Sequence, residues 1–241
     1  MKMINRVQIW LLLALLWVVF STSGCKKNND DTSPESDTVT DIEGNVYKTV
    51  KIGSQWWMAE NLKTTKYNDG TDIPQVKEYE SWRYLASPGF CWFENDPDTY
   101  KNKYGALYNW YAVNTGKLAP KGWHVPTDTE WNTLINYLGG WQVAGGKMKS
   151  TGTIEAGTGV WYAPNAGATN ESGFSAVPTG GREEGGGFIQ QLPYEADWWS
   201  STEADINNAL DCLIRYDHTT AGCEPDGLDK SCGLSIRCVK D

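Results

Sequence analysis

The chain has 241 residues, a formal net charge of -9 and 13 tryptophans. A chain of this length is long enough for one domain with a sizeable hydrophobic core. Nucleic acids are bound through patches of lysine and arginine, so the acidic balance argues against a nucleic-acid partner.

A cleaved export signal is predicted over residues 1–24. Lys2 and Arg6 precede an apolar run from Ile9 to Phe20, and the small residues Ser21 to Gly24 follow it. This order of charged, apolar and small residues is typical of a signal peptide. The run is shorter than the roughly 20 apolar residues that a membrane-spanning helix needs. An uncleaved membrane anchor is the alternative interpretation.

Cys25 is the predicted lipidation site. It follows Ser23 and Gly24 directly, and this string resembles the lipobox of bacterial lipoproteins, although Thr22 stands where the strict motif has leucine. The resemblance implies a lipid anchor in the bacterial cell envelope, at the outer membrane, with exposure at the cell surface as one further reading. The alternative is a disulfide cysteine.

A flexible tether is predicted over residues 25–40. Lys26 to Thr40 contain one valine and no aromatic residue, so they cannot bury enough apolar surface to become ordered. Asp30 and Asp31 resemble the acidic tract with which some Bacteroidetes direct lipoproteins to the cell exterior, and a merely soluble linker is the other interpretation. The globular domain would then span residues 41–241.

Short elements separated by turns are expected in this domain. Asp41 to Met58 alternate apolar and polar residues around a Gly-Asn turn, which predicts two or three strands of a meander. Tyr104 to Val113 have apolar residues at helical spacing. Thr127 and Glu130 form a capping box before a second helix, which is expected to end at Gly139-Gly140.

The rest of the domain is predicted to be less regular. Residues 145–187 are rich in Gly, Thr, Ala and Asn, which indicates a long irregular segment. Strand patterns return at residues 209–216 and 233–240.

Several strings of the domain occur in the same order in one known family. They are Asp41–Tyr47, Trp57–Thr64, Tyr104–Val113, Gly122–Trp131, Ala168–Phe174, Trp199–Glu203 and Ser235–Asp241. Over residues 38–241 the chain closely resembles the Fibrobacter succinogenes major paralogous domain. The resemblance implies an exported lipoprotein from a multi-copy set and assigns it no ligand.

A weaker resemblance bears on the fold. Tyr108–Ala112 followed by His124–Trp131 looks like the helix pair of the formylglycine-generating-enzyme family. It implies an α+β domain, C-type-lectin-like or formylglycine-generating-enzyme-like, with small antiparallel sheets, two helices and long loops. Fold alone does not fix function.

The cysteines of an exported domain are expected to form disulfides. Cys223 and Cys232 flank a short polar loop, which favours a local bridge. The family resemblance implies Cys91 with Cys238 as a second pair and leaves Cys212 over. Alternatively, Cys212 bridges Cys238 and Cys91 is free.

No arrangement of residues points to catalysis, and we expect a domain that is not an enzyme. His124 and His218 lack metal-ligand spacing, and His124 is interpreted as a packed structural residue. A glycosidase needs two carboxylates that face each other across a cleft. The sequence does not show that any two of its candidate acids are arranged in this way. These candidates are Glu94, Asp96, Asp98, Glu171, Glu183 and Glu184.

Two further segments resemble ligand-binding motifs in part. Glu94 to Asp98 supply oxygen ligands suited to calcium but lack the spacing of an EF-hand, so a solvated turn is the alternative. Gly180 to Gly187 are glycine-rich but lack the Gly-Lys-Ser/Thr ending of a nucleotide-binding loop. No cofactor is expected, with calcium as the one alternative.

Polysaccharide binding is the first functional hypothesis, because exposed aromatic rings stack on sugars. The aromatic candidates are Trp198, Trp199 and Trp92, with the pair Trp56-Trp57 as a further place, and the polar candidates are Asn95, Asn170 and Glu171. Placement of all these tryptophans in the core is the alternative. The expected function is thus a lipid-anchored envelope or surface binding module. A protein-interaction or adhesion module and a lipid-tethered enzyme are the other hypotheses.

Overall fold

The computed structural model describes residues 34–189 and 192–241. The predicted signal peptide and Cys25 lie outside the described residues. Among the residues described, no helix is long and apolar enough to cross a membrane.

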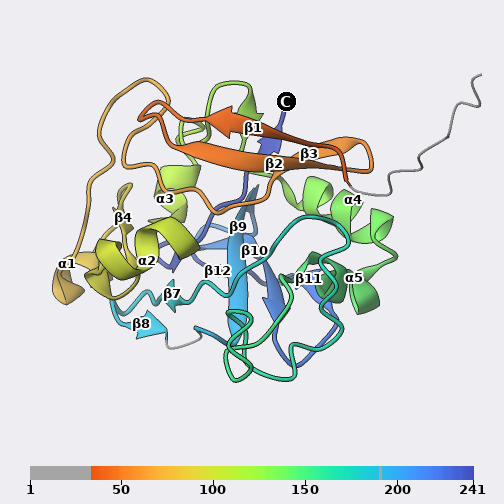
Figure 1. The fold of residues 1–241 in the computed structure, drawn as a ribbon. Helices are drawn as coiled ribbons and strands as arrows, with labels where there is room; N and C mark the ends of the chain where they lie inside the picture. Colours follow the sequence, from red (N-terminus) through yellow and green to blue (C-terminus); the bar gives the residue numbers. More distant parts are fainter. Residues whose placement is uncertain (1–33, 190–191) are drawn as a thin grey trace, which may run out of the picture. The chain divides into compact units, whose positions relative to one another are not determined.

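The first sheet contains the N-terminal strands, which cross the upper part of Figure 1. Its strand order is β1-β2-β3-β14-β6, with antiparallel neighbours. The strands are β1 (Ser36–Thr40), β2 (Val46–Ile52), β3 (Gln55–Met58), β14 (Val239–Lys240) and β6 (Trp123–His124). The predicted meander over residues 41–58 is therefore confirmed by β2 and β3.

Strand β1 changes the boundary of the predicted tether. The last five residues of the predicted tether, 36–40, form β1 and pair with β2. Ser36 lies opposite Val50, and Thr40 lies opposite Val46. Backbone hydrogen bonds to a neighbouring strand do not require apolar side chains, so a polar segment can form this edge strand.

The second sheet forms the centre of the domain. It comprises β9 (Glu195–Glu203), β10 (Asn208–Arg215), β11 (Ala221–Cys223) and β12 (Leu228–Asp229), and β10 pairs with the other three. Strand β9 is buried on both faces, because Trp199 packs into one hydrophobic cluster and Trp198 into another. This central position explains why β9 has no alternation of apolar and polar residues.

The third sheet is made of short strands from distant parts of the chain, in the order β4-β5-β13-β7-β8. They are β4 (Phe90–Cys91), β5 (Leu107–Asn109), β13 (Gly233–Leu234), β7 (Gly181–Arg182) and β8 (Phe188–Ile189).

The helices in the described part of the chain are short. The longest, α4 (Asp128–Tyr137), begins with the predicted capping box: the Thr127 hydroxyl accepts a hydrogen bond from the Glu130 backbone N–H, and the Glu130 carboxylate accepts one from the Thr127 N–H. The others are α1 (Tyr79–Arg83), α2 (Pro97–Tyr104), α3 (Trp110–Val113) and α5 (Trp141–Met148), with a 3-10 turn η1 (Phe93–Asn95).

The α+β prediction, C-type-lectin-like or formylglycine-generating-enzyme-like, is wrong. The domain is mostly β, built from three antiparallel curled sheets with only about 18% helix. The predicted helix over Tyr104–Val113 contains β5 and only the single turn α3. Nearly every residue of this segment is buried, and a strand buried on both faces cannot be told from a helix by hydrophobic periodicity.

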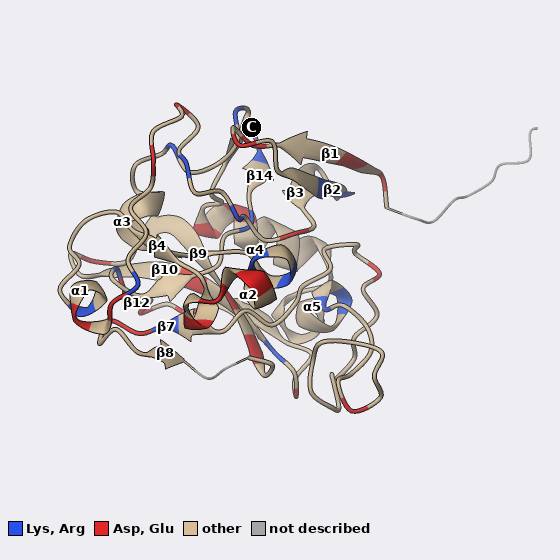
Figure 2. Ribbon diagram, turned by 60° about the vertical axis from the view of Figure 1, so that its left-hand side comes forward, with Lys and Arg blue, Asp and Glu red and all other residues tan. Residues whose placement is uncertain are grey.

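The charged residues are distributed widely. Figure 2 shows acidic and basic positions interspersed along the ribbon, including successive turns of α2. This pattern fits a solvated surface with local charge clusters.

Candidate functional site

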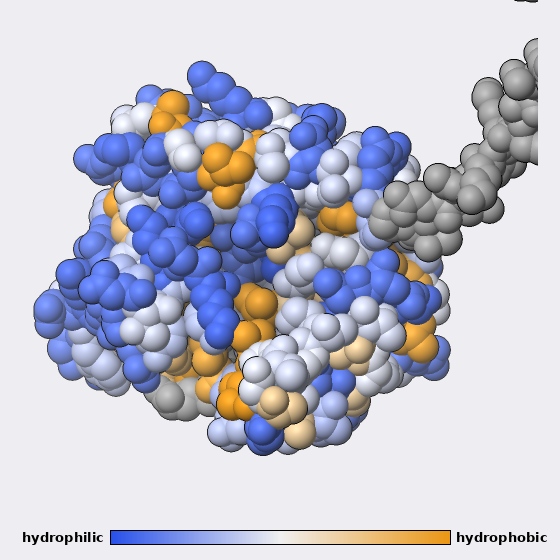
Figure 3. All heavy atoms as spheres, in the orientation of Figure 1, coloured by the Kyte–Doolittle hydropathy of each residue, from blue (hydrophilic) through white to orange (hydrophobic). Residues whose placement is uncertain are grey.

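A cavity of about 240 Å³ opens between α2, the segment after β3 and the irregular segment that follows α5. Figure 3 shows this face of the domain hollowed near its centre, with hydrophilic residues along much of the rim. Its charged lining residues are Lys48, Lys63, Lys103, Arg237 and Glu60. Its uncharged lining residues are Ala59, Asn61, Asn102, Gly105, Ser150, Ser175 and Val177.

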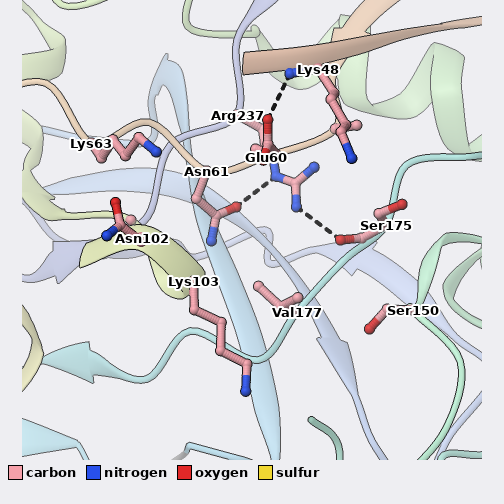
Figure 4. Close-up of a pocket in the computed structure, with 12 residues that line it drawn as sticks. Lys48, Glu60, Asn61, Lys63, Asn102, Lys103, Ser150, Ser175, Val177 and Arg237 are labelled. Carbon is pink, nitrogen blue, oxygen red and sulfur yellow. Dashed lines mark hydrogen bonds between the residues drawn. The ribbon is translucent and has the colours of Figure 1, made fainter. Parts of the chain in front are cut away.

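Three different segments carry the lysines around this cavity, as Figure 4 shows. Lys48 lies on β2 between the buried residues Tyr47 and Thr49, so strand alternation turns it outward. The ammonium of Lys63 lies 5.7 Å from the centre of the Tyr47 ring. Lys103 is in the last turn of α2.

Gly105 allows α2 to end directly against the cavity. Its φ of +81° is in the region that favours glycine. A Cβ at this position would lie 2.7 Å from both Asn61 Cβ and the Leu62 carbonyl oxygen. This close approach places the end of α2 next to the segment that carries Asn61 and Lys63.

Arg237 forms the floor of the cavity and is fully buried. Its Nε donates to Asn61 Oδ1 at 2.6 Å, and Nη1 donates to the carbonyl oxygens of Met58 at 3.0 Å and Phe174 at 2.7 Å. Nη2 donates to the Ser175 carbonyl at 3.2 Å. Burial lowers the pKa of Arg237 to about 9, so the guanidinium remains a cation at neutral pH.

One carboxylate accompanies these four cations. Glu60 accepts a hydrogen bond from the Lys48 backbone N–H at 2.6 Å, which holds it at the edge of the cavity. The lining residues thus carry a net positive charge, whereas the chain as a whole has a net charge of -9. Ammonium and guanidinium groups are the side chains that bind carboxylate, sulfate or phosphate through charge-assisted hydrogen bonds.

The three tryptophans predicted to bind ligand are core residues. Trp198 and Trp199 are 0% exposed and Trp92 is 4% exposed. The indole N–H of Trp198 donates to Asn61 Oδ1 at 3.0 Å, and that of Trp199 donates to the Tyr108 carbonyl at 2.8 Å. Buried rings cannot stack on an external sugar, so this part of the prediction is wrong. Trp57 is also fully buried, whereas Trp56 is partly exposed.

The predicted polar partners are not brought together at the cavity. Asn95 donates from Nδ2 to the Lys77 carbonyl at 3.1 Å, and Glu171 forms an exposed ion pair of 3.1 Å with Lys147. Asn170 comes nearest to the prediction, since its Oδ1 accepts from the backbone N–H of Ser175, a lining residue, at 2.9 Å. Asn170 therefore positions Ser175, which lines the cavity, and does not line the cavity itself.

The predicted disulfides are absent from the described residues, where all five cysteines are free. Cys232 is not bonded to Cys223, and its Sγ lies 3.7 Å from Glu184 Oε2. Cys91 is not bonded to Cys238 and instead contacts Arg182. Cys223 instead lies opposite Cys212.

The candidate metal ligands and the two histidines lie outside the lining of the cavity. The described residues contain no group of three or more His, Cys, Asp or Glu side chains that could hold a metal ion. In the segment considered for calcium, Asp96 caps α2 by accepting from the Thr99 N–H at 3.1 Å. Both ring nitrogens of His124 contact carboxylates, Asp241 and Glu130, each at 2.7 Å, which fits its predicted structural role.

A comparison with family models decides the relationship of the chain. The model of the Fibrobacter succinogenes major domain matches residues 50–240. The chain belongs to this family. Searches among curated proteins and among solved structures give no significant match.

The family strings carry a signal that sequence reasoning did not use. Trp57–Thr64, Tyr104–Val113 and Ser235–Asp241 of this family domain each supply lining residues, and the Phe174 carbonyl of Ala168–Phe174 accepts a hydrogen bond from Arg237. Strings far apart in the sequence thus converge on one cavity. Attention to their charged members would have identified Lys63 and Arg237.

Proposed function

We propose that the domain is a binding module for an acidic polysaccharide, and that the cavity around Arg237 receives an anionic group of that polymer. The observation that carries the proposal is the concentration of four cationic side chains and one carboxylate in one cavity of an acidic chain. A uronate carboxylate or a sulfate ester entering there would meet the ammonium groups of Lys48, Lys63 and Lys103.

The uncharged lining residues suit sugar hydroxyl groups. Asn102, Ser150 and Ser175 offer donors and acceptors beside the cations. The volume of about 240 Å³ is below the roughly 300–1,000 Å³ of drug-sized pockets, which favours a single charged sugar residue of a longer chain. Since none of the described residues that line the cavity is aromatic, recognition would depend on charge and hydrogen bonds.

The proposal is tested by titrating the protein with polygalacturonate and, in parallel, with a neutral galactan. We expect binding of the acidic polymer only, with an affinity that falls as salt is raised because exposed charges are screened. The double variant Lys63→Ala/Lys103→Ala should weaken binding at least about tenfold, since each hydrogen bond to a charged group contributes about 1.5–3 kcal/mol.

Lys77→Ala is the matched control, because Lys77 is exposed and does not line the cavity. It removes one positive charge and should leave affinity within about twofold of wild type. Equal affinity for the neutral polymer, or equal loss in the control and the cavity variant, would refute the assignment of the cavity.

We also propose presentation of this module at the bacterial cell envelope through a lipid on Cys25. The support is the signal-like sequence before Cys25 and the lipobox resemblance. Membrane fractionation and intact mass of the wild type and of Cys25→Ala test this step. Lipid on the wild type and release or failed processing of the variant are expected, whereas identical behaviour would contradict it.

A protein-interaction module is the second candidate. Trp141, at the start of α5, is 60% exposed, and the neighbouring side chains Tyr137 and Val143 are exposed as well. Exposed apolar groups of this kind occur at protein interfaces. Retention of an envelope protein by the wild type but not by Trp141→Ser, with no glycan bound by either, would favour this function.

A further inference from the structure

Cys212 and Cys223 occupy directly opposed positions on neighbouring strands. Cys212 is on β10 and Cys223 on β11, and the antiparallel register pairs them. The Glu224 N–H donates to the Asp211 carbonyl oxygen at 3.1 Å, just outside the pair. This bond identifies the two cysteines as a non-hydrogen-bonded pair, the type whose Cα atoms approach to about 4.5 Å.

We propose that Cys212 and Cys223 are a redox-active pair that oxidises to an intramolecular disulfide. Disulfides require Cα atoms about 4.4–6.8 Å apart and Cβ vectors that point to the same side, and a non-hydrogen-bonded pair meets both conditions. Both side chains face the same hydrophobic cluster. Burial and, next to it, the neighbouring Cys223 thiol raise the pKa of the Cys212 thiol.

The other described cysteines have different surroundings. Cys91 lies against the Arg182 guanidinium, and the Cys232 thiol contacts the Glu184 carboxylate. Cys238 is fully buried beside β14. Among these cysteines, only Cys212 and Cys223 face each other across a strand pair.

Exposure gives the two thiols separate roles. Cys223 is partly exposed, whereas Cys212 is buried. An external disulfide, such as oxidised glutathione, can therefore reach Cys223 first. The Cys223 thiol loses its proton to water, its thiolate attacks one sulfur of the oxidant, and a mixed disulfide forms as one glutathione thiolate leaves.

Cys212 completes the exchange. Its thiol gives up a proton, the thiolate attacks Cys223 Sγ, and the second glutathione leaves as the Cys212–Cys223 bond forms. Two protein thiols are oxidised and one external disulfide is reduced to two thiols, which take up the two protons. Burial raises the pKa of the Cys212 thiol, so this second step should be the slower one.

The bond would close the hairpin whose loop anchors the end of α5. Lys149 Nζ donates to the carbonyl oxygens of Arg215 at 3.0 Å and His218 at 2.8 Å, and the Gly146 N–H donates to the Thr219 carbonyl at 3.0 Å. A disulfide at the base of this loop restricts the unfolded chain and so stabilises these contacts.

The decisive experiment compares the folded full chain after incubation with oxidised glutathione and with a reductant. Free thiols are alkylated in denaturant, and the proteolytic peptides are mapped by mass spectrometry without reduction. We expect Cys212 and Cys223 to be joined in the oxidised sample and alkylated in the reduced one. The oxidised protein should unfold roughly 5–10 °C higher.

Two variants separate the steps. Cys212→Ser should accumulate a glutathione mixed disulfide at Cys223, because its resolving thiol is gone, and Cys232→Ser should keep the wild-type difference in unfolding temperature. Alkylation of both cysteines after oxidation, or a bond from either one to another cysteine, would overturn the proposal. The wild-type peptide map decides this even if a variant fails to fold, and it does not depend on glycan binding.

Discussion

The buried guanidinium of Arg237 and the side chain of Asn61 are joined by a hydrogen bond of 2.6 Å from Nε to Oδ1. The same oxygen accepts the indole N–H of Trp198 at 3.0 Å, and Asn61 Nδ2 donates to the Tyr104 carbonyl at 2.8 Å. One amide therefore links the floor of the cavity, a core tryptophan and the end of α2.

Replacement of Asn61 by alanine should destabilise the domain by about 2–4 kcal/mol, because it leaves two buried donors, on Arg237 and Trp198, without an acceptor. Urea unfolding measures the change. Asn61→Asp retains the acceptor and adds a negative charge beside Arg237, so it should cost less than Asn61→Ala. Equal losses in the two variants would argue against this role of the oxygen.

The carboxyls of Asp197 and Asp211 should make stability depend on pH. Burial raises the pKa of Asp211 to about 6, and burial together with the Asp211 charge raises the pKa of Asp197 further. The folded state thus holds protons that the unfolded chain releases near pH 4, so this contribution to stability falls as pH rises through 6.

Asp197→Asn removes one of these two acids and tests that dependence. We expect the variant to be more stable than wild type at pH 7 and to lose less stability between pH 4 and pH 7, a range over which the pair lowers wild-type stability by on the order of 2 kcal/mol. Denaturant midpoints at several pH values are the measurement. Parallel pH profiles for the two proteins would contradict the assignment.

Gly145 should tolerate no side chain. A Cβ there would lie 2.0 Å from the Thr220 carbonyl oxygen, a rigid backbone atom. Gly145→Ala is expected to destabilise the domain by at least about 3 kcal/mol in thermal or urea unfolding. Gly222→Ala is the matched control, since nothing lies within 4 Å of its Cβ position, and it should change stability by less than about 0.5 kcal/mol.

His124 should contribute to stability at low pH. Burial opposes its charged form, but hydrogen bonds with the Asp241 and Glu130 carboxylates outweigh that effect and raise the pKa of His124. The contribution is complete below the unfolded value of about 6.5 and is lost as pH rises through the folded pKa.

His124→Gln should therefore cost more at pH 5.5 than at pH 8.5. The difference should stay below about 1 kcal/mol, because the ring is partly exposed to solvent. Unfolding at these two pH values measures it. A cost that does not change with pH would assign His124 a packing role alone.

Local rules predicted the elements whose causes lie within a few residues. The Thr127 capping box forms as expected, because its hydrogen bonds need only neighbouring groups. Gly139-Gly140 does end α4, yet Gly140 is also the N-cap of α5, a helix that was missed. The sequence rule treats these glycines only as a stop signal, although the chain resumes helical geometry at Trp141, directly after Gly140.

Long-range pairing explains the larger errors. Strand β5 is held by β4 and β13, which are distant in sequence, so its residues gave no local strand pattern. The cavity was missed for the same reason, since Lys48, Lys103 and Arg237 come from three separate segments. The tryptophan content suggested that some of these rings are exposed. In this domain of three sheets, however, Trp198 and Trp199 are buried in separate hydrophobic clusters on opposite faces of one strand.

The segment from Gly233 to Lys240 reaches all three sheets. It supplies β13 to the third sheet, a bridge from Ser235 to Trp198 in the second, and β14 to the first. A chain emerging from a ribosome or a translocation pore cannot complete the first and third sheets until this segment is free, because β14 and β13 are inner strands of those sheets. The domain would therefore stay incompletely folded through most of its synthesis and become native in one late step.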